Sequence, residues 1–358
     1  MHIESIGIRI SYSNAEHLRK WLSSHNAINQ SLSFTKEENS LIMPLILSEE
    51  EASNLLLTYS EDVYFLIRVF QFEEKDFHPK NLFEAVEKAI PINQHKYIPK
   101  AYDMIGDIVV VDIPEEISDY NNAIGDSLCD LFPSINSVYR KASSVSGKFR
   151  IRELELIAGE EKCETVHLEY GIRISVNVCE TYFSPRLGDE HKKVADSVKQ
   201  NECIIDLFTG VGSFPLHIAK NHDSIVYAID INKNAIECLE KSISMNKLKG
   251  TIHPIHSDCR EAVKSIPKAN RVIMNLPGKS LEFVDVACDV LKPNGILYFY
   301  HFTSEKSPKK EIIKELNKEL TKSGWKIKET IDYRKVRDSA PREIQACLEV
   351  TAVPLSES

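Results

Sequence analysis

The stretch Cys203-Ile204-Ile205-Asp206-Leu207-Phe208-Thr209-Gly210-Val211-Gly212-Ser213-Phe214 decides the fold of this chain. Its first part is an apolar run typical of a strand that is buried on both faces, and two glycines then introduce a helical pattern. A buried strand that passes through a glycine turn into a helix is the first unit of a doubly wound sheet. In such sheets ligands bind beyond the carboxyl ends of the strands.

The same alternation of strand and helix continues towards the C-terminus. Five such alternations followed by two β segments indicate an α/β fold, a Rossmann-like doubly wound sheet with an antiparallel edge. We expect strands near 203–207, 225–229, 251–256, 271–275 and 296–301, helices near 213–220, 233–246, 280–291 and 309–323, and late strands near 325–333 and 344–352.

Two smaller units precede this sheet, so we predict three domains, at 1–73, 74–180 and 181–358. In the first, an α/β unit, Ile6–Ile10 alternates like a strand, Asn14 is expected to cap a helix, and Ser48 has capping-box spacing before another helix. The middle domain has an α+β pattern. It begins with Asn81 as the cap of an amphipathic helix and continues with β-rich stretches near 105–113, 149–156 and 171–178.

The composition is that of an ordinary globular protein of 358 residues, with 42% hydrophobic and 27% charged residues. No apolar run approaches the ~20 residues that span a bilayer, and the N-terminus lacks a signal-peptide pattern. We therefore expect a cytoplasmic protein without a membrane partner. Its eight cysteines include no CxxC pair, so we expect no metal site and thiols that are small buried hydrophobes in a reducing compartment.

The net charge of −9 argues against a polyanionic partner, but the charges are unevenly distributed. Residues 36–76 hold ten acids and three bases, whereas residues 140–152 hold five bases and no acid. A basic face on an acidic protein is therefore possible. On this clustering alone, the candidate contacts to a nucleic acid are Arg140, Lys141, Lys148, Arg334, Lys335 and Arg337.

The glycine turn favours a cationic ligand over a pyrophosphate. Pro215 stands where the third glycine of the dinucleotide-binding pattern belongs, so a nicotinamide dehydrogenase is not supported. Asp206, four residues before Gly210, would repel a pyrophosphate and would suit the charged amino-acid end of S-adenosylmethionine.

The next three strands also end in polar residues. Asp230 lies 24 residues after Asp206, where a carboxylate can accept hydrogen bonds from ribose hydroxyls, and Asp258 is expected to hold the adenine amino group. Each acid alone is equally well explained as a helix N-cap, but four consecutive strand ends predict a class I methyltransferase domain that binds S-adenosylmethionine. The candidate cofactor-binding residues are Asp206, Phe208, Gly210, Gly212, Asp230, Asp258, Asn275 and Pro277.

With these motifs the chain resembles the archaeal and eukaryotic Trm5-type tRNA (guanine-37-N1)-methyltransferases over almost its whole length. The resemblance rests on Asp206–Phe214 and Asn275-Leu276-Pro277, and also on Ile105-Gly106-Asp107-Ile108, Gly147–Arg152 and Tyr182–Leu187. The N-terminal unit looks like the small first domain of that family, which helps to grip the outer corner of tRNA.

The resemblance implies methyl transfer to N1 of guanosine 37 in tRNA. Guanine N1 carries a proton at neutral pH, so the reaction needs a base for this proton and a donor that stabilises charge on O6. By the family pattern Glu190 is the base, Arg150 is the O6 donor, and Asn275 orients the base by hydrogen bonds. Tyr182 and Arg186 would shape the pocket and hold phosphate or the flipped guanine. Because several domains act on one tRNA, we expect a monomer.

Other interpretations remain open for these residues. Glu190 lies near a helix start, where it would also favour the helix dipole, and Arg150 is equally explained as a phosphate contact. His191 stands where the family usually has arginine, and Thr209 and Ser213 replace more usual residues beside the glycines. Rival functions are a wyosine-pathway enzyme, which transfers an aminocarboxypropyl group or methylates a tricyclic guanine derivative at position 37, and a non-catalytic tRNA-binding protein.

Overall fold

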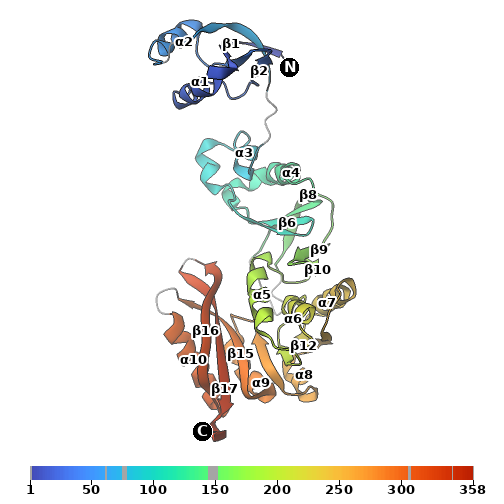
Figure 1. Cartoon of the computed structure of the whole chain (residues 1–358). Helices are drawn as coiled ribbons and strands as arrows, with labels where there is room; N and C mark the ends of the chain where they lie inside the picture. Colours follow the sequence, from blue (N-terminus) through green and yellow to red (C-terminus); the bar gives the residue numbers. More distant parts are fainter. Residues whose placement is uncertain are drawn as a thin grey trace. The chain divides into compact units, whose positions relative to one another are not determined.

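The computed structural model describes residues 2–60, 63–74, 79–143, 152–304, 308–340 and 342–357. The chain divides into two compact units, residues 1–80 and 81–358 (Figure 1). Each unit has its own hydrophobic core and is described separately. None of the helices within the described ranges is long and apolar enough to cross a bilayer.

The first unit is a four-stranded antiparallel sheet that carries two helices. Its helices, α1 (Tyr12–Ser24) and α2 (Glu49–Leu56), bury Leu18, Leu22 and Leu56 in one cluster with Ile8 and Met43 of the sheet. The strands are ordered β2 (Thr35–Glu37), β3 (Ser40–Pro44), β1 (His2–Ser11) and β4 (Phe65–Glu73).

We compared the two predicted helix N-caps of this unit with the structure. Ser48 and Glu51 form the predicted capping box at α2, with the Glu51 N–H donating to Ser48 Oγ over 3.2 Å. The prediction for Asn14 is wrong, because β1 runs directly into α1 and leaves Ser11 at the cap position. Asn14 lies within the first turn and donates to Ser11 Oγ over 3.4 Å.

The second unit begins with a four-stranded sheet. Helices α3 (Leu82–Val86), which Asn81 caps as predicted, and α4 (Asn121–Leu131) share its hydrophobic core. The single β stretch expected near 105–113 is in fact two strands, because Gly106 has a φ of +56° and turns the chain into a hairpin. The strands are ordered β5 (Tyr102–Ile105), β6 (Ile108–Val111), β7 (Ser137–Lys141) and β8 (Leu154–Gly159).

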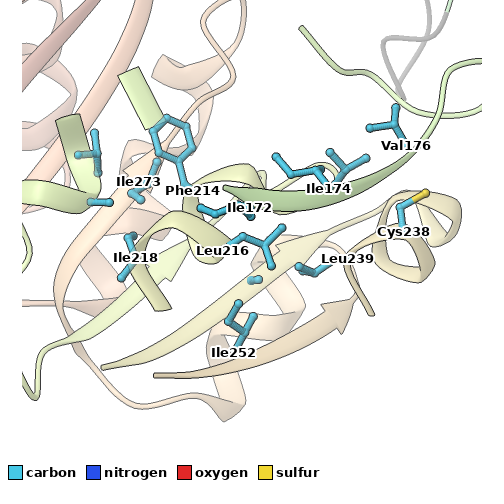
Figure 2. Packing of buried hydrophobic residues seen from close by; sticks show 14 of the residues in the cluster. Ile172, Ile174, Val176, Phe214, Leu216, Ile218, Cys238, Leu239, Ile252 and Ile273 are labelled. Carbon is cyan, nitrogen blue, oxygen red and sulfur yellow. The ribbon is translucent and has the colours of Figure 1, made fainter. Parts of the chain in front are cut away.

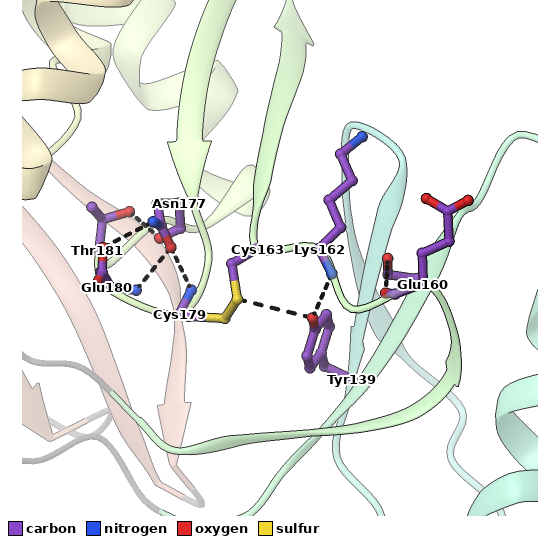
Figure 3. The surroundings of a disulfide bond; sticks show 9 residues. Tyr139, Glu160, Lys162, Cys163, Asn177, Cys179, Glu180 and Thr181 are labelled. Carbon is purple, nitrogen blue, oxygen red and sulfur yellow. Dashed lines mark hydrogen bonds between the residues drawn. A yellow bond between two sulfur atoms is a disulfide. The ribbon is translucent and has the colours of Figure 1, made fainter.

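A β-hairpin follows, made of β9 (Glu164–Glu169) and β10 (Ile172–Asn177). Its antiparallel register brings the two ends of the hairpin together, and a disulfide joins Cys163 to Cys179 there, with the Cα atoms 5.6 Å apart (Figure 3). The interpretation of the cysteines as free thiols is therefore wrong for this pair. The other six cysteines, all within the described residues, are free.

Seven described strands form the large sheet, in the order β13-β12-β11-β14-β15-β17-β16. The first five pair in parallel, and β17 pairs antiparallel with β15 and β16, which confirms the predicted Rossmann-like sheet with an antiparallel edge. The strands are β11 (Cys203–Asp206), β12 (Ile225–Asp230), β13 (Thr251–His256), β14 (Ala269–Met274), β15 (Leu291–Ser304), β16 (Trp325–Ala340) and β17 (Glu343–Pro354).

Helices cover both faces of the large sheet (Figure 1). One face carries α5 (Gly188–Ser197), α6 (Ser213–Asn221) and α7 (Lys233–Met245), and the other carries α9 (Val284–Val290) and α10 (Pro308–Lys322). On the first face, Ile172 and Ile174 of β10 share a buried cluster with Leu216 and Leu239 (Figure 2). Because Val211 of the glycine turn belongs to this cluster too, the packing anchors the turn, α5 and the hairpin to one core.

Candidate active site

A cavity of about 400 Å³ lies at the carboxyl ends of the parallel strands, a size typical of small-molecule sites. Its walls come largely from the turns after β11, β12, β13 and β14. The structure thus brings together strand ends that are distant in the sequence. Six of the eight predicted cofactor-binding residues line this cavity: Phe208, Gly210, Asp230, Asp258, Asn275 and Pro277.

The turn between β11 and α6 uses its two glycines differently. Gly210 has a φ of +55°, and a Cβ placed there would have Tyr182 O, 3.8 Å away, as its nearest neighbour. Gly212 has a φ of +86°, and a Cβ there would come within 2.2 Å of Leu239 Cδ1. Gly210 therefore leaves room for a ligand, whereas Gly212 permits the turn to pack closely against α7.

Asp230 holds this turn in place from the neighbouring strand. Its Oδ2 accepts a hydrogen bond from the Gly210 N–H over 2.7 Å, and its Oδ1 accepts one from the Asn232 N–H over 2.8 Å. Burial raises the pKa of the Asp230 carboxyl, and these backbone donors oppose the rise. Each oxygen keeps a further lone pair, so Asp230 can also accept hydrogen bonds from the hydroxyls of a ligand.

The other two strand-end acids differ in exposure. Asp206 is fully buried and is not among the described residues that line the cavity, although the next two residues, Leu207 and Phe208, are; its Oδ2 has no hydrogen-bond partner within the described part of the chain. Burial raises the pKa of Asp206 to about 7. Asp258 lines the cavity and also caps the short helix α8 (Cys259–Ala262) by accepting from the Arg260 N–H over 3.0 Å.

A second cavity, of about 280 Å³, adjoins the first and has a cationic lining. Burial, together with the nearby charge of Arg152, lowers the pKa of Lys141. Two carboxylates, Asp103 and Asp338, also line this cavity and partly offset the positive charge, and Arg186 donates from Nε to Asp103 Oδ1 over 2.7 Å. The second cavity is lined by Lys141, Arg152, Arg186 and Asp103, and it shares Tyr182, Phe183, Ser184 and Arg337 with the first.

A chain of hydrogen bonds crosses the border between the two cavities. Gln345 donates from Nε2 to Asn275 Oδ1 over 3.2 Å and accepts at Oε1 from Arg337 Nε over 2.7 Å. Arg337 in turn donates from Nη2 to Tyr182 OH over 2.7 Å. The sequence identifies Arg337 by its charge alone and carries no signal for Gln345, whose place depends on the pairing of β17 with β15 and β16.

Glu190 lies in the first turn of α5 and is buried. Arg334 of β16 donates to it twice, from Nε to Oε2 over 2.8 Å and from Nη2 to Oε1 over 2.6 Å, and Tyr300 OH donates to Oε1 over 2.5 Å. Among the described residues, the cavity wall includes the nearby Leu187 and His191 but not Glu190. Its carboxylate is thus engaged in a buried ion pair.

Glu169, at the end of β9, forms a buried cluster with His191 and His217. This cluster was not predicted from the sequence. Its Oε1 accepts from His191 Nδ1 over 2.9 Å and from His217 Nε2 over 2.7 Å. Burial alone would raise the pKa of Glu169, but the hydrogen bonds from the two histidines lower it to about 2. The three side chains are also a possible metal-ligand set, with ligand atoms within 4.8 Å of one another, although the N–O distances are those of direct hydrogen bonds.

Of the remaining predicted residues, Arg140 lies in β7, Lys335 lies in β16, and Lys148 and Arg150 follow β7 in the sequence. Arg140 forms an ion pair with Glu155 of β8, with 2.5 Å between Nη2 and Oε2. Lys148 and Arg150 lie outside the described residues, so their roles stay predictions.

Comparison with known proteins assigns the family. The model of the TRM5/TYW2 methyltransferase domain matches residues 165–328, that of the TYW2 N-terminal domain residues 82–162, and that of the tRNA methyltransferase 5 N-terminal domain residues 7–53. The tRNA (guanine(37)-N(1))-methyltransferase Trm5b of Methanocaldococcus jannaschii is 35% identical over 340 residues, which cover 94% of this chain and 95% of that protein. The chain belongs to the Trm5 family.

Further relatives agree with this family. Trm5b of Pyrococcus abyssi is 31% identical and aligns over 96% of this chain and 98% of its own length. A solved complex of aTrm5 with tRNALeu superposes with a TM-score of 0.77 at 32% identity, covering 97% of this chain and 99% of that chain. The predicted Trm5 family, its methyltransferase domain and S-adenosylmethionine as the cofactor are thereby confirmed.

Proposed function

We propose that this chain transfers a methyl group from S-adenosylmethionine to N1 of guanosine 37 in tRNA, with Glu190 as the base, Arg150 at O6 and Asn275 as an orienting residue. The observation that carries the proposal is the pair of adjoining cavities. One has acidic strand ends suited to a nucleoside with a cationic tail, and the other has a cationic lining suited to a phosphate.

The first cavity fits the cofactor in its charges and in its shape. Asp230 keeps lone pairs for ribose hydroxyls, Gly210 leaves room beside the turn, and Asp206 is a buried carboxyl whose second oxygen lacks a partner within the described chain. Phe208 and Phe283 provide an apolar wall, with ring centroids 5.1 Å apart. The cofactor supplies an electrophilic methyl group, and these residues bind and orient it.

The second cavity supports tRNA as the substrate. Lys141, Arg152 and Arg186 supply the positive charge that a nucleotide phosphate requires, and phosphate contacts set the position of a nucleic acid without reading its sequence. Guanosine 37 has to leave its stack to reach the first cavity, which costs a few kcal/mol. Tyr182 lines both cavities and Asn275 lines the first. They are joined through Arg337 and Gln345 and would hold the extruded base.

Methyl transfer from labelled S-adenosylmethionine to tRNA transcripts with G37 or A37, followed by nucleoside analysis, tests the proposal. We expect N1-methylguanosine with G37 alone, and its loss in Glu190→Gln while cofactor binding is retained. Modification of a tricyclic base at position 37, with G37 left untouched, would instead support the wyosine-pathway alternative. Cofactor binding without any transfer would support a non-catalytic tRNA-binding protein.

A further inference from the structure

Gln345 is a polar side chain in an apolar part of β17. It is 1% exposed, and its neighbours in the strand, Ile344 and Ala346, belong to a hydrophobic cluster. Burying an amide is costly unless its hydrogen-bonding groups are satisfied. Both ends of the Gln345 amide have a partner: Oε1 accepts from Arg337 Nε over 2.7 Å, and Nε2 donates to Asn275 Oδ1 over 3.2 Å.

A bulge in β16 places Arg337 next to this amide. The register with β17 shifts just before Arg337, so that Arg337 lies opposite Gln345, where a regular ladder would place Val336. Bulges often redirect a side chain beside a functional site. The other two nitrogens of the Arg337 guanidinium donate to Tyr182 OH over 2.7 Å and to Ser184 Oγ over 3.3 Å, which fixes its orientation.

The direction of the hydrogen bonds from Arg337 to Asn275 follows from the guanidinium. Because a guanidinium has donors only, the Gln345 atom at 2.7 Å has to be the amide oxygen. The other end of that amide is then the NH2 group, and the Asn275 atom that it contacts has to be an oxygen. Asn275 Nδ2 makes no hydrogen bond within the described residues, and Asn275 lines the first cavity. Its two N–H donors are therefore left for a ligand.

We propose that Gln345 is a positioning residue that determines specificity for guanine: fixed by Arg337, it holds the Asn275 amide with its donors towards the substrate base. This inference rests on the proposed function, in which Asn275 orients guanosine 37. Beside N1, guanine carries the acceptor O6, whereas adenine carries an N6 amine at the same position. An N–H donor in the cavity wall pairs with O6 and finds no partner in the amine, so this arrangement favours G37 over A37.

The test is single-turnover methyl transfer to a G37 transcript at saturating cofactor. Gln345→Glu keeps the acceptor for Arg337 but has no donor for Asn275, whose amide should turn over and present Oδ1 to the cavity. Gln345→Met removes both hydrogen bonds and leaves the Asn275 amide free to take either orientation. We expect a roughly 100-fold slower reaction in Gln345→Glu and a smaller loss in Gln345→Met. The control is Gln200→Glu, at an exposed residue whose Oε1 accepts from the Asp223 N–H over 2.8 Å, and it should keep the full rate.

Discrimination between the two purines is measured by competition. An A37 transcript should compete with the G37 transcript more effectively in Gln345→Glu than in the unchanged protein, because Asn275 Oδ1 can accept from the N6 amine. Equal competition in the two proteins would refute a role of Gln345 in specificity.

Thermal unfolding separates positioning from packing. Gln345→Glu keeps its bond to Arg337 and should unfold at a higher temperature than Gln345→Met, although its reaction is slower. An effect that acts through Asn275 is also non-additive: in an Asn275→Ala background, Gln345→Glu should slow the reaction no further. A packing effect would instead follow the order of stability and would add to the loss in Asn275→Ala.

Three further results would overturn the inference: a full rate in Gln345→Glu, a faster reaction in Gln345→Glu than in Gln345→Met, or additive losses in the Asn275→Ala background. If neither variant folds, Asn275→Asp keeps the acceptor for Gln345 and replaces the donor for the ligand, and retained activity there would refute that donor. A full rate in Asn275→Ala refutes Asn275 as the orienting residue of the proposed function. An impaired Asn275→Ala beside a fully active Gln345→Glu refutes only the role of Gln345.

Discussion

Asp230 Oδ2 accepts a 2.7 Å hydrogen bond from the backbone N–H of Gly210, so a carboxylate at the end of β12 fixes the glycine turn at the end of β11. The two strands are parallel neighbours, and their carboxyl ends therefore meet at one edge of the sheet. Through this bond the side chain that is best placed for a ribose also sets the shape of the turn beside it. Binding and local folding depend on the same charge.

Replacing Asp230 by asparagine tests this double role. The amide keeps one acceptor oxygen but loses the charge, and hydrogen bonds to charged groups are worth about 1.5–3 kcal/mol. We expect S-adenosylmethionine to bind roughly 10- to 100-fold more weakly in isothermal titration. Asp223→Asn is the control, because Asp223 is exposed just before the opposite end of β12. Equal affinities in the two variants would contradict the assignment.

From the raised pKa of the Asp206 carboxyl we expect cofactor binding to depend on pH. Its pKa of about 7 means that half of the free protein carries a neutral carboxyl at that pH. A cationic ligand favours the carboxylate, so binding should release a proton, and affinity should rise from about pH 6 to about pH 8. Titrations in two buffers with different ionisation enthalpies measure the released proton directly. In Asp206→Asn the pH dependence in this window should disappear; a release that persists would assign it to another group.

The residues of the first cavity were largely predictable because they follow a local rule. Each parallel strand is an apolar run with a polar residue at its end, and parallel pairing gathers those ends at one edge. Asp230, Asp258 and Asn275 were found in this way. The rule also located β13 to the residue. It underestimated the lengths of β15 and β16. Their antiparallel pairing with β17 continues past their apolar centres, to Ser304 and Ala340.

The buried charge clusters were not predictable, because no periodic pattern marks them. Glu190 and Arg334 are 144 residues apart, and Glu169 and His217 are 48 apart. Their contacts depend on which helix covers which strand, and a pattern of apolar residues along the chain does not specify such a pairing. The same applies to Cys163 and Cys179, which become neighbours only through the register of the β9–β10 hairpin.

The Cys163–Cys179 disulfide predicts a stability that depends on reductant. Closing a loop of about 15 residues restricts the unfolded chain and is worth about 3 kcal/mol. We expect a reductant to lower the unfolding temperature, and Cys163→Ser to have the same effect and to abolish the response to reductant. Cys203→Ser, at a free thiol, is the control. Thiol titration of the denatured protein should find six thiols without reductant, since two of the eight are paired, and a count of eight would refute the bond.

We expect the contribution of the Glu169 carboxylate to the stability of the fold to be lost in acid. Its pKa is about 2 in the folded protein, against an ordinary value of 4.5, because His191 and His217 donate to it. A lowered carboxyl pKa stabilises the fold fully above the unfolded value, and this stabilisation is lost as the pH falls from 4.5 towards 2. Glu169→Gln should therefore lower the free energy of unfolding at neutral pH by roughly 3 kcal/mol, and by much less in strong acid. Denaturant unfolding at both pH values, with the exposed Glu164→Gln on the same strand as control, measures the difference. An equal loss at both values would show that packing, and not ionisation, is what Glu169 contributes.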